Sequence, residues 1–201
     1  TQSRSSAASD VYKRQGEPFV LATFHPTSFD TATPVQQVEV FLRALDGIAG
    51  AIVLTAPNPD AASELFLAKY RDYAAAHPRV RLFEALGAQN YYAAMASAHY
   101  MIGNSSSGMW ESASFPLPVV NIGPRQQGRV HGDNVVNCEL DAQAIAAAIA
   151  KATDPAFRAG LDGRTPYVQA DTVALILDCL KHPWDRARLL AKRFVDPLGL
   201  R

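Results

Sequence analysis

The stretch MIGNSSSGMWESASFPLPVVNIGPRQQGRVHGD, residues Met101 to Asp133, decides the fold. It begins in an apolar run and passes into the turn Gly103–Gly108, which holds three consecutive serines. A helix-compatible segment follows, then a second apolar run over residues 117–122 and a loop with basic side chains. This order is expected where a parallel sheet holds a phosphorylated ligand at the carboxyl ends of its strands.

The alternation of short apolar runs with helical patterns continues along the rest of the chain. Periodicity predicts strands at residues 19–24, 51–55, 79–83, 99–102, 117–121 and 134–138. It predicts helices at residues 34–48, 61–76, 89–98, 106–114, 141–152 and 172–180. We expect Asp60 to cap the second helix and Gly50 to end the first. Together these elements predict an α/β fold, a Rossmann-like doubly wound parallel sheet.

Composition divides the chain into three parts. Residues 1–15, TQSRSSAASDVYKRQ, are polar and basic without periodicity, and we interpret them as a disordered tail or a non-native segment. Residues 16–181 are expected to form one Rossmann-like domain. Residues 182–201 have mixed composition and are expected to form a C-terminal tail.

Charge and cysteine usage exclude several function classes. The formal net charge is zero, so nothing electrostatic favours a nucleic acid or an anionic membrane as partner. No apolar run approaches the roughly 18 residues of a membrane span. Cys138 and Cys179 are far apart without metal-type spacing, and we interpret them as buried thiols of a cytoplasmic protein. No metal motif is present, so neither a metal nor a cofactor is expected.

The serine turn has two interpretations. Hydroxyls and backbone N–H groups at a helix N-terminus bind phosphate well, because the dipole and the unpaired donors point toward it. Alternatively, Asn104 or Ser105 is an ordinary helix cap and nothing binds. The turn lacks the lysine of a Walker loop and does not match G-x-G-x-x-G.

Glu111 follows the turn and could accept two hydrogen bonds from a ribose, or simply complement the helix dipole. Arg125, Arg129 and His131 lie in the loop after the fifth strand. A guanidinium pairs bidentately with phosphate oxygens, whereas surface solubility is the alternative role for such a loop.

His25 and Asn58 follow the first and second predicted strands. His25 could contact a pyrophosphate, transfer a proton, or have only a structural role. Asn58 alone means little. A parallel sheet brings the loops after its strands to one edge, so we expect these residues to converge with the serine turn and the basic loop at one crevice.

Several of these motifs together resemble the UDP-N-acetylglucosamine 2-epimerases. They are Gly-Asn-Ser-Ser-Ser-Gly at 103–108, Glu111, Pro-Val-Val-Asn-Ile-Gly at 118–123, Arg125-Gln126 and Gly128-Arg129. The segment Thr23–Thr27 is similar to the His-Pro-x-Thr segment of the hydrolysing branch, and the His-Arg-Arg-Glu-Asn of the other branch is missing. The resemblance covers about residues 18–180 and implies one half of a GT-B architecture, the C-terminal nucleotide-binding domain.

The resemblance also implies roles for individual residues. It places His25 at the diphosphate, Asn58 at the wall of the UDP pocket and the backbone around Leu86 at the uracil. It further implies Ser105 and Ser106 at the β-phosphate, Glu111 at the ribose hydroxyls and Arg125 at the phosphate and sugar, with Gln126 and Arg129 as further candidates.

The activity implied by the resemblance is inversion at C2 with elimination of UDP through a glycal, followed by addition of water. It feeds sialic and legionaminic acid synthesis, and the full-length protein is expected to be a homo-oligomer. The family's acid/base residues belong to the N-terminal domain and have no counterpart here, so this chain is expected to bind UDP weakly and not to turn over a UDP-sugar.

Three questions stay open at this point. The sugar could be N-acetylglucosamine or a 2,4-diacetamido-trideoxyhexose. The chain could instead be the C-terminal domain of a GT-B glycosyltransferase, although the His-Pro-x-Thr and Gly-Pro-Arg-Gln segments favour the epimerase. It could also be a non-catalytic nucleotide-binding module.

Overall fold

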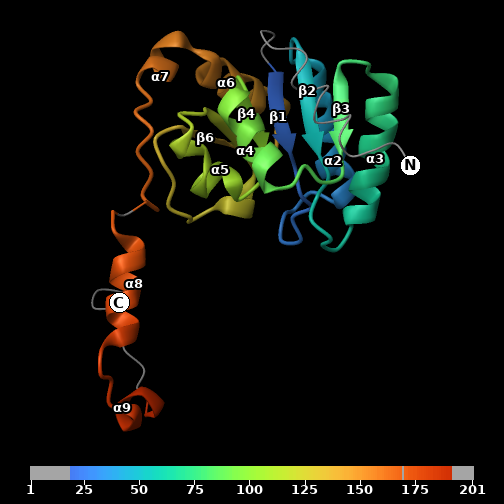
Figure 1. Ribbon diagram of the computed structural model, residues 1–201. Coiled ribbons are helices and arrows are strands. Elements are labelled where there is room, and N and C mark those ends of the chain that lie inside the picture. The colour runs from blue at the N-terminus through green and yellow to red at the C-terminus, as the bar shows by residue number, and fades with distance from the viewer. Residues whose placement is uncertain (1–18, 169, 192–201) are drawn as a thin grey trace. The chain divides into compact units, whose positions relative to one another are not determined.

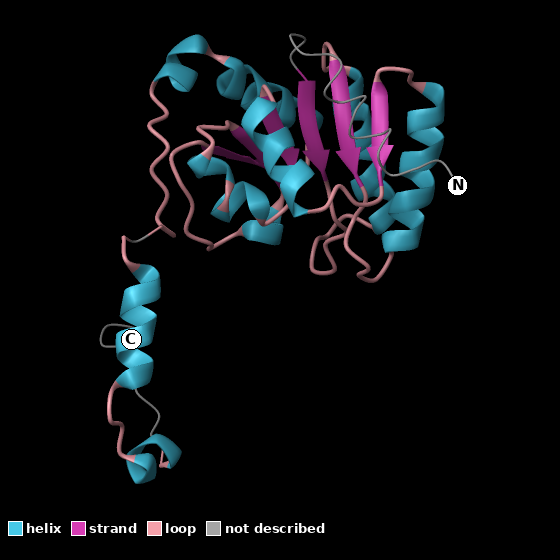
Figure 2. Ribbon diagram, viewed as in Figure 1, coloured by secondary structure: helices cyan, strands magenta, loops and turns pink. Residues whose placement is uncertain are grey.

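The computed structural model describes residues 19–168 and 170–191. The expectations for residues 1–15 and for the last part of the C-terminal tail lie outside the described residues. The strands are β1 Phe19–Thr23, β2 Ala51–Thr55, β3 Val80–Phe83, β4 Tyr100–Gly103, β5 Val119–Ile122 and β6 Val135–Cys138. They form one sheet in the order β3-β2-β1-β4-β5-β6, and every neighbouring pair is parallel. The arrowheads of β1, β2 and β3 accordingly point to one edge (Figure 2).

Helices follow the strands in turn, which confirms the predicted α/β doubly wound fold. They are α2 Pro34–Asp46, α3 Ser63–Ala76, α4 Ala88–Ser97, α5 Ser107–Trp110, α6 Ala142–Thr153, α7 Pro155–Ala159, α8 Thr172–Lys181 and α9 Arg186–Leu190. Two short 3-10 helices, η1 Ser112–Ser114 and η2 Pro124–Gln126, complete the described elements.

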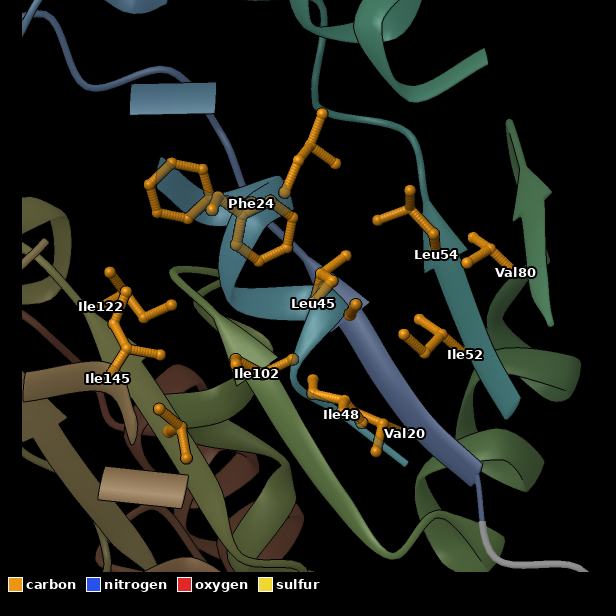
Figure 3. Close-up of a cluster of buried hydrophobic side chains, with 14 of the residues drawn as sticks. Val20, Phe24, Leu45, Ile48, Ile52, Leu54, Val80, Ile102, Ile122 and Ile145 are labelled. Carbon is orange, nitrogen blue, oxygen red and sulfur yellow. The ribbon is translucent and has the colours of Figure 1, made fainter. Parts of the chain in front are cut away.

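Alternate residues of each strand point to opposite faces of the sheet and build two apolar layers. On one face α2, α3 and α6 pack against strand residues such as Val20, Ile52 and Ile102, and the labelled side chains of Figure 3 belong to this layer. On the other face α4, which crosses in front of the sheet in Figure 1, packs against Leu21 and Met101. The sheet is therefore covered on both faces and leaves its carboxyl edge open for function.

The first helix ends earlier than the sequence predicts. Thr33 and Gln36 form a capping box, and Pro34 occupies the first turn as expected. The predicted end at Ile48, before Gly50, is wrong because α2 stops at Asp46. The Arg79 guanidinium, at the start of β3, donates to the carbonyls of Leu45 at 2.8 Å and Ile48 at 2.5 Å. These bonds satisfy the C-terminal carbonyls, and no local pattern could reveal them.

Two other helix predictions need correction. Asp60 is not the N-cap of α3: that position is Ala62, with φ 65°, and the carbonyl of Asp60 accepts from the Ser63 N–H. The helix predicted at residues 106–114 breaks at Glu111 into α5 and η1. The Ser112 hydroxyl donates to the Gly108 carbonyl at 2.7 Å, a bond that competes with regular helix continuation.

The chain divides into two compact units between Tyr167 and Val168. This division falls 14 residues before the domain end expected at residue 181. The first unit contains the whole sheet. The second contains α8 and α9, and its Cys179 is exposed, while Cys138 of the first unit is half-buried, so the interpretation of both cysteines as buried thiols is wrong.

Candidate functional site

The strand order reverses between β1 and β4. From β1 the chain adds β2 and β3 on one side of the sheet, and it then returns to place β4, β5 and β6 on the other side. In an open parallel sheet the crevice beyond the carboxyl ends of such a pair is the usual ligand position. Thr23 and Gly103 are register partners there. Gly103 has φ 137°, and a Cβ atom on it would lie 1.9 Å from the Thr23 carbonyl oxygen. Glycine is therefore required for the two strand ends to approach this closely. We call this point the central crevice.

Asn104 joins the loops that meet at the central crevice. Its side-chain Oδ1 accepts from the His25 backbone N–H at 2.7 Å, and its Nδ2 donates to the His25 carbonyl at 2.9 Å. Its own carbonyl accepts from Arg125 Nη1 at 3.1 Å and from Gln126 Nε2 at 2.7 Å. The idea that Asn104 caps a helix is therefore wrong: this buried residue fixes the loops after β1 and β5 to the end of β4.

His25 is buried and neutral. Its Nδ1 accepts from the Asn58 backbone N–H at 3.0 Å, so the ring proton lies on Nε2. Burial first, and then the positive charge of Arg125, lower its pKa from 6.5 to about 4, with Asp60 acting weakly in the opposite direction. At neutral pH the Nε2–H is thus a fixed hydrogen-bond donor. Of the three roles considered from the sequence, this state suits contact with an anion better than proton donation by a cationic imidazole. The bonds to Asn104 and Asn58 show that the residue also has a structural role.

The serine turn offers backbone donors besides one long bond of capping type, in which the Ser105 hydroxyl accepts from the N–H of Ser107, the first residue of α5, at 3.4 Å. Helix α5 has a single turn, its N-cap position is Ser106, and the Ser106 side chain makes no capping bond. In the described part of the chain, the Ser105 and Ser106 backbone N–H groups donate no hydrogen bond. The Ser105 hydroxyl is close to Ser107, with 3.3 Å between the two oxygens. Two free N–H groups in succession form the kind of concavity that binds an anion.

Arg125 reaches the same crevice from the loop after β5. Its guanidinium bonds Asn104 and lies 3.9 Å from the Asp60 carboxylate. Burial lowers the pKa of Arg125, and the Asp60 carboxylate opposes this shift. Asp60, which the sequence suggested as a helix cap, instead partners this cation. Because the pair is long and half of the Asp60 side chain is exposed, Arg125 can exchange this carboxylate for an incoming anion.

A cavity, which we call the side pocket, lies beside the central crevice. Its volume is about 280 Å³, and its lining includes Thr55 at the end of β2, Leu86 before α4, and Glu111. Tyr91 and Tyr92 of α4 form its wall. The Tyr92 hydroxyl donates to Glu111 Oε1 at 2.7 Å, and this bond raises the pKa of Tyr92. Leu86 and Glu111, 25 residues apart in the sequence, therefore share one pocket.

Tyr91 links the side pocket to the serine turn. Its hydroxyl interacts with the hydroxyls of Ser107, Thr23 and Ser105, while burial raises its pKa. The Thr23 hydroxyl in turn bonds that of Thr55 at 2.5 Å. A continuous row of hydroxyl groups thus joins the turn to Thr55 in the side-pocket lining, so the central crevice and the side pocket adjoin one another.

The other residues that the sequence suggested for the site either lie outside the central crevice and the side pocket or contribute through structural hydrogen bonds. Asn58 is exposed and absent from the side-pocket lining, and its contribution is the N–H that holds His25. Gln126 is buried, with its amide on Asn104. Arg129 lies over the Trp110 ring at 5.1 Å, and with His131 it lines a separate cavity of about 480 Å³. The basic loop therefore divides, and of its basic residues only Arg125 bonds to the central crevice.

Residues 19–168 and 170–191 contain no candidate for a metal site or for a membrane-spanning helix. No cluster of three or more histidine, cysteine or acidic residues in this part of the chain is arranged to hold a metal ion. No helix in it has the length and apolar character needed to cross a membrane.

Comparison with known protein families shows which family has this sequence pattern. The family model described as UDP-N-acetylglucosamine 2-epimerase matches residues 1–181. The chain belongs to this family. The sequence left open a GT-B glycosyltransferase domain, and membership in the epimerase family decides against that alternative.

Similar proteins carry related names. The chain is 34% identical over 123 residues to the GDP/UDP-N,N'-diacetylbacillosamine 2-epimerase (hydrolyzing) of Campylobacter jejuni, covering 60% of this chain and 32% of that protein. It is 33% identical over 125 residues to the UDP-N,N'-diacetylbacillosamine 2-epimerase (hydrolyzing) of Legionella pneumophila, covering 62% and 33%. The chain thus spans about a third of the length of these relatives in the matched region.

A solved structure supports the architecture. The S. aureus MnaA–UDP co-structure superposes with a TM-score of 0.64 at 18% identity, covering 90% of this chain and 48% of the other. The sheet is accordingly one half of a GT-B architecture, as the motifs predicted.

The sequence missed several residues of the candidate site. Asn104 stood inside the recognised turn, but its role requires the fold to bring His25, 79 residues away, into contact. Tyr91 and Tyr92 carried no signal beyond an aromatic pair on an otherwise alanine-rich helix. Only their place in the lining of the side pocket marks them.

Proposed function

We propose that the central crevice and the side pocket together bind the uridine diphosphate part of a nucleotide sugar. The observation that carries this proposal is the joining of His25, the serine turn and Arg125 by one buried residue, Asn104. Three kinds of anion donor thereby meet at the point where the strand order reverses. The neighbouring pocket holds a carboxylate suited to a ribose diol.

Each group has a distinct role in this proposal. The His25 Nε2–H, the Ser105 and Ser106 N–H groups and Arg125 donate to the diphosphate oxygens. Glu111 accepts from the ribose hydroxyls, and the backbone near Leu86 meets the uracil. Asn58 acts indirectly, by holding His25. Arg129 and Gln126, further candidates from the sequence, have no direct role.

We further propose that the complete protein is a hydrolysing UDP-sugar 2-epimerase, for which this chain supplies the nucleotide half. The reaction eliminates UDP from the sugar and adds water to the glycal, with inversion at C2. The candidate sugars are N-acetylglucosamine and N,N'-diacetylbacillosamine, a 2,4-diacetamido-trideoxyhexose, because two hydrolysing relatives are named for the latter. The product would enter sialic or legionaminic acid synthesis.

The proton chemistry is assigned to the other half. In the described residues the carboxylate nearest to the cation of the central crevice, Asp60, is engaged with Arg125, and Glu111 belongs to the side pocket. Neither pairs with a second acid as general acid/base chemistry at C2 requires. The chain alone is therefore expected to bind UDP without turning over a UDP-sugar.

Two measurements test this proposal. Calorimetric titration of the purified chain should show UDP binding, with uridine binding more weakly because it lacks the diphosphate. Incubation with UDP-N-acetylglucosamine or UDP-N,N'-diacetylbacillosamine should release UDP when the complete protein is present and not with this chain alone. No UDP binding at millimolar concentration would refute the site, and UDP release by the isolated chain would refute the division of roles.

A further inference from the structure

Glu111 is held in place by a neighbour that the proposed function does not use. The Tyr92 hydroxyl donates to Glu111 Oε1 at 2.7 Å. In the described part of the chain no other group donates a hydrogen bond to this carboxylate. The Tyr92 ring stacks on Phe115, with 6.0 Å between centroids and 28° between planes. Tyr92 thus rests on one neighbouring ring, stays 43% exposed, and directs its hydroxyl to one oxygen of Glu111.

The position of Glu111 in the chain leaves its side chain free to rotate unless a neighbour holds it. Glu111 follows a helix of one turn and separates it from η1, so its backbone belongs to neither regular element. A glutamate side chain in such a setting samples several rotamers, and a ligand that requires one of them must overcome that loss of freedom. A hydrogen bond from a ring that is already packed selects one rotamer before the ligand arrives.

The bond also leaves the carboxylate able to bind. An ionised carboxylate has about four acceptor positions on its two oxygens, and Tyr92 occupies one. The remaining positions can accept the two hydroxyls of a cis-diol. Because Tyr92 and Glu111 both line the side pocket, the diol would bind beside the tyrosine rather than replace it.

We propose that Tyr92 is a positioning residue that orients Glu111 and thereby determines how strongly the site distinguishes a ribose from a sugar without the diol. This inference rests on the proposed uridine diphosphate site and adds a residue that sets its specificity. Tyr92 acts through Glu111 and need not touch the ligand.

The experiment compares UDP with 2′,3′-dideoxy-UDP, which keeps the base and the diphosphate but has no diol. Calorimetry on the full chain would give dissociation constants for wild type, Tyr92→Phe and Glu111→Gln. Tyr92→Phe should weaken UDP binding about fivefold, the scale of one hydrogen bond. It should change binding of the dideoxy analogue by less than about twofold, because the carboxylate has nothing to hold there. Adding Tyr92→Phe to Glu111→Gln should cause little further loss of UDP affinity.

The chain offers a matched control. The Tyr73 hydroxyl donates to Asp46 Oδ1, also at 2.7 Å, and neither residue lines the side pocket. Tyr73→Phe removes the same kind of bond and should leave both dissociation constants unchanged. Tyr91→Phe gives a contrasting pattern, since Tyr91 contacts the serine turn: it should weaken both nucleotides to the same degree.

The outcomes separate the inference from the function on which it rests. Equal losses of UDP and dideoxy-UDP in Tyr92→Phe would overturn the inference alone, because they would indicate a general structural role. Unchanged or tighter UDP binding in that variant would also overturn it, since Tyr92 would then be idle or would obstruct Glu111. Failure of the wild-type chain to bind UDP at all would overturn both.

Discussion

The loops at the central crevice are buried and bonded to one another, whereas the side pocket is lined by partly open side chains. At the crevice, His25 and Asn104 are 3% and 1% exposed, and each is bonded through both backbone and side chain. At the side pocket, Tyr92 is 43% exposed and its hydroxyl serves only Glu111. The crevice is therefore part of the fold's polar core, and changes there should alter stability as well as binding. Changes at Tyr92 and Glu111 of the side pocket should alter binding alone.

Gly103→Ala should have the largest effect. The new Cβ would lie 1.9 Å from the Thr23 carbonyl oxygen at a φ of 137°, so the β1 and β4 ends would have to separate. We expect a loss of about 4 kcal/mol or more in the free energy of unfolding, the range of severe core disruptions. Denaturant titration measures this.

Gly128→Ala is the control, because Gly128 has a positive φ of 79° but a Cβ atom on it would meet nothing within 4 Å. It should cost only about 1 kcal/mol, the backbone strain alone. Similar losses in the two variants would show that the close approach at the crevice is not what makes Gly103 necessary.

The pH dependence of stability should report on His25. Its folded pKa of about 4 lies below the usual 6.5, so the unfolded chain binds more protons between these values. The neutral form stabilises the fold fully above pH 6.5, and this contribution falls by about 3 kcal/mol as the pH drops to 4. His25→Asn keeps a side-chain acceptor for the Asn58 N–H but cannot titrate. Unfolding of both proteins at pH 7 and pH 4 measures the difference, and parallel pH profiles would contradict the burial of a neutral ring.

Glu111→Ala tests the side pocket. We expect UDP binding to weaken by about 1–3 kcal/mol, the scale of lost hydrogen bonds to a charged group, while the unfolding midpoint stays unchanged. Calorimetry and denaturant titration of the same variant give both quantities. If the free energy of unfolding fell and UDP affinity did not, Glu111 would stabilise the fold rather than bind the ligand. The side pocket would then not differ from the central crevice in the way proposed.

Arg129→Ala should have the smallest effect on the ligand. The guanidinium lies over Trp110 and lines the separate cavity, and it makes no hydrogen bond to Asn104, although its charge acts on Arg125. UDP affinity should change by less than about 0.5 kcal/mol, as for a charge outside the contact surface. Arg125→Ala is the paired comparison and should weaken UDP binding at least tenfold, or about 1.4 kcal/mol. A loss of equal size in both variants would place the whole basic loop at the diphosphate.

Sequence alone determined the order of the elements and the fold class. Apolar runs of period two and helical runs of period 3.6 identify strands and helices because burial on a sheet face or helix stripe imposes those periods. The parallel arrangement then required the loops after the strands to share one edge, which brought His25 and the Gly103–Gly108 turn into one hypothesis. The glycines and serines of this turn also indicated, from the local sequence alone, a turn that can bind phosphate.

Only the tertiary structure decided which groups in those loops face the central crevice. From the sequence, Asn104 could equally cap a helix, and only the structure shows that its side chain bonds His25, 79 residues away. Asp60 could likewise cap α3, and only the structure shows that its carboxylate lies beside Arg125. The pKa of His25 depends on its burial and on Arg125, 100 residues further along the chain. Tyr92 acquires a role only because α4 brings it to Glu111. Hydrogen bonds and desolvation depend on distances in space, which a pattern of neighbours along the chain does not encode.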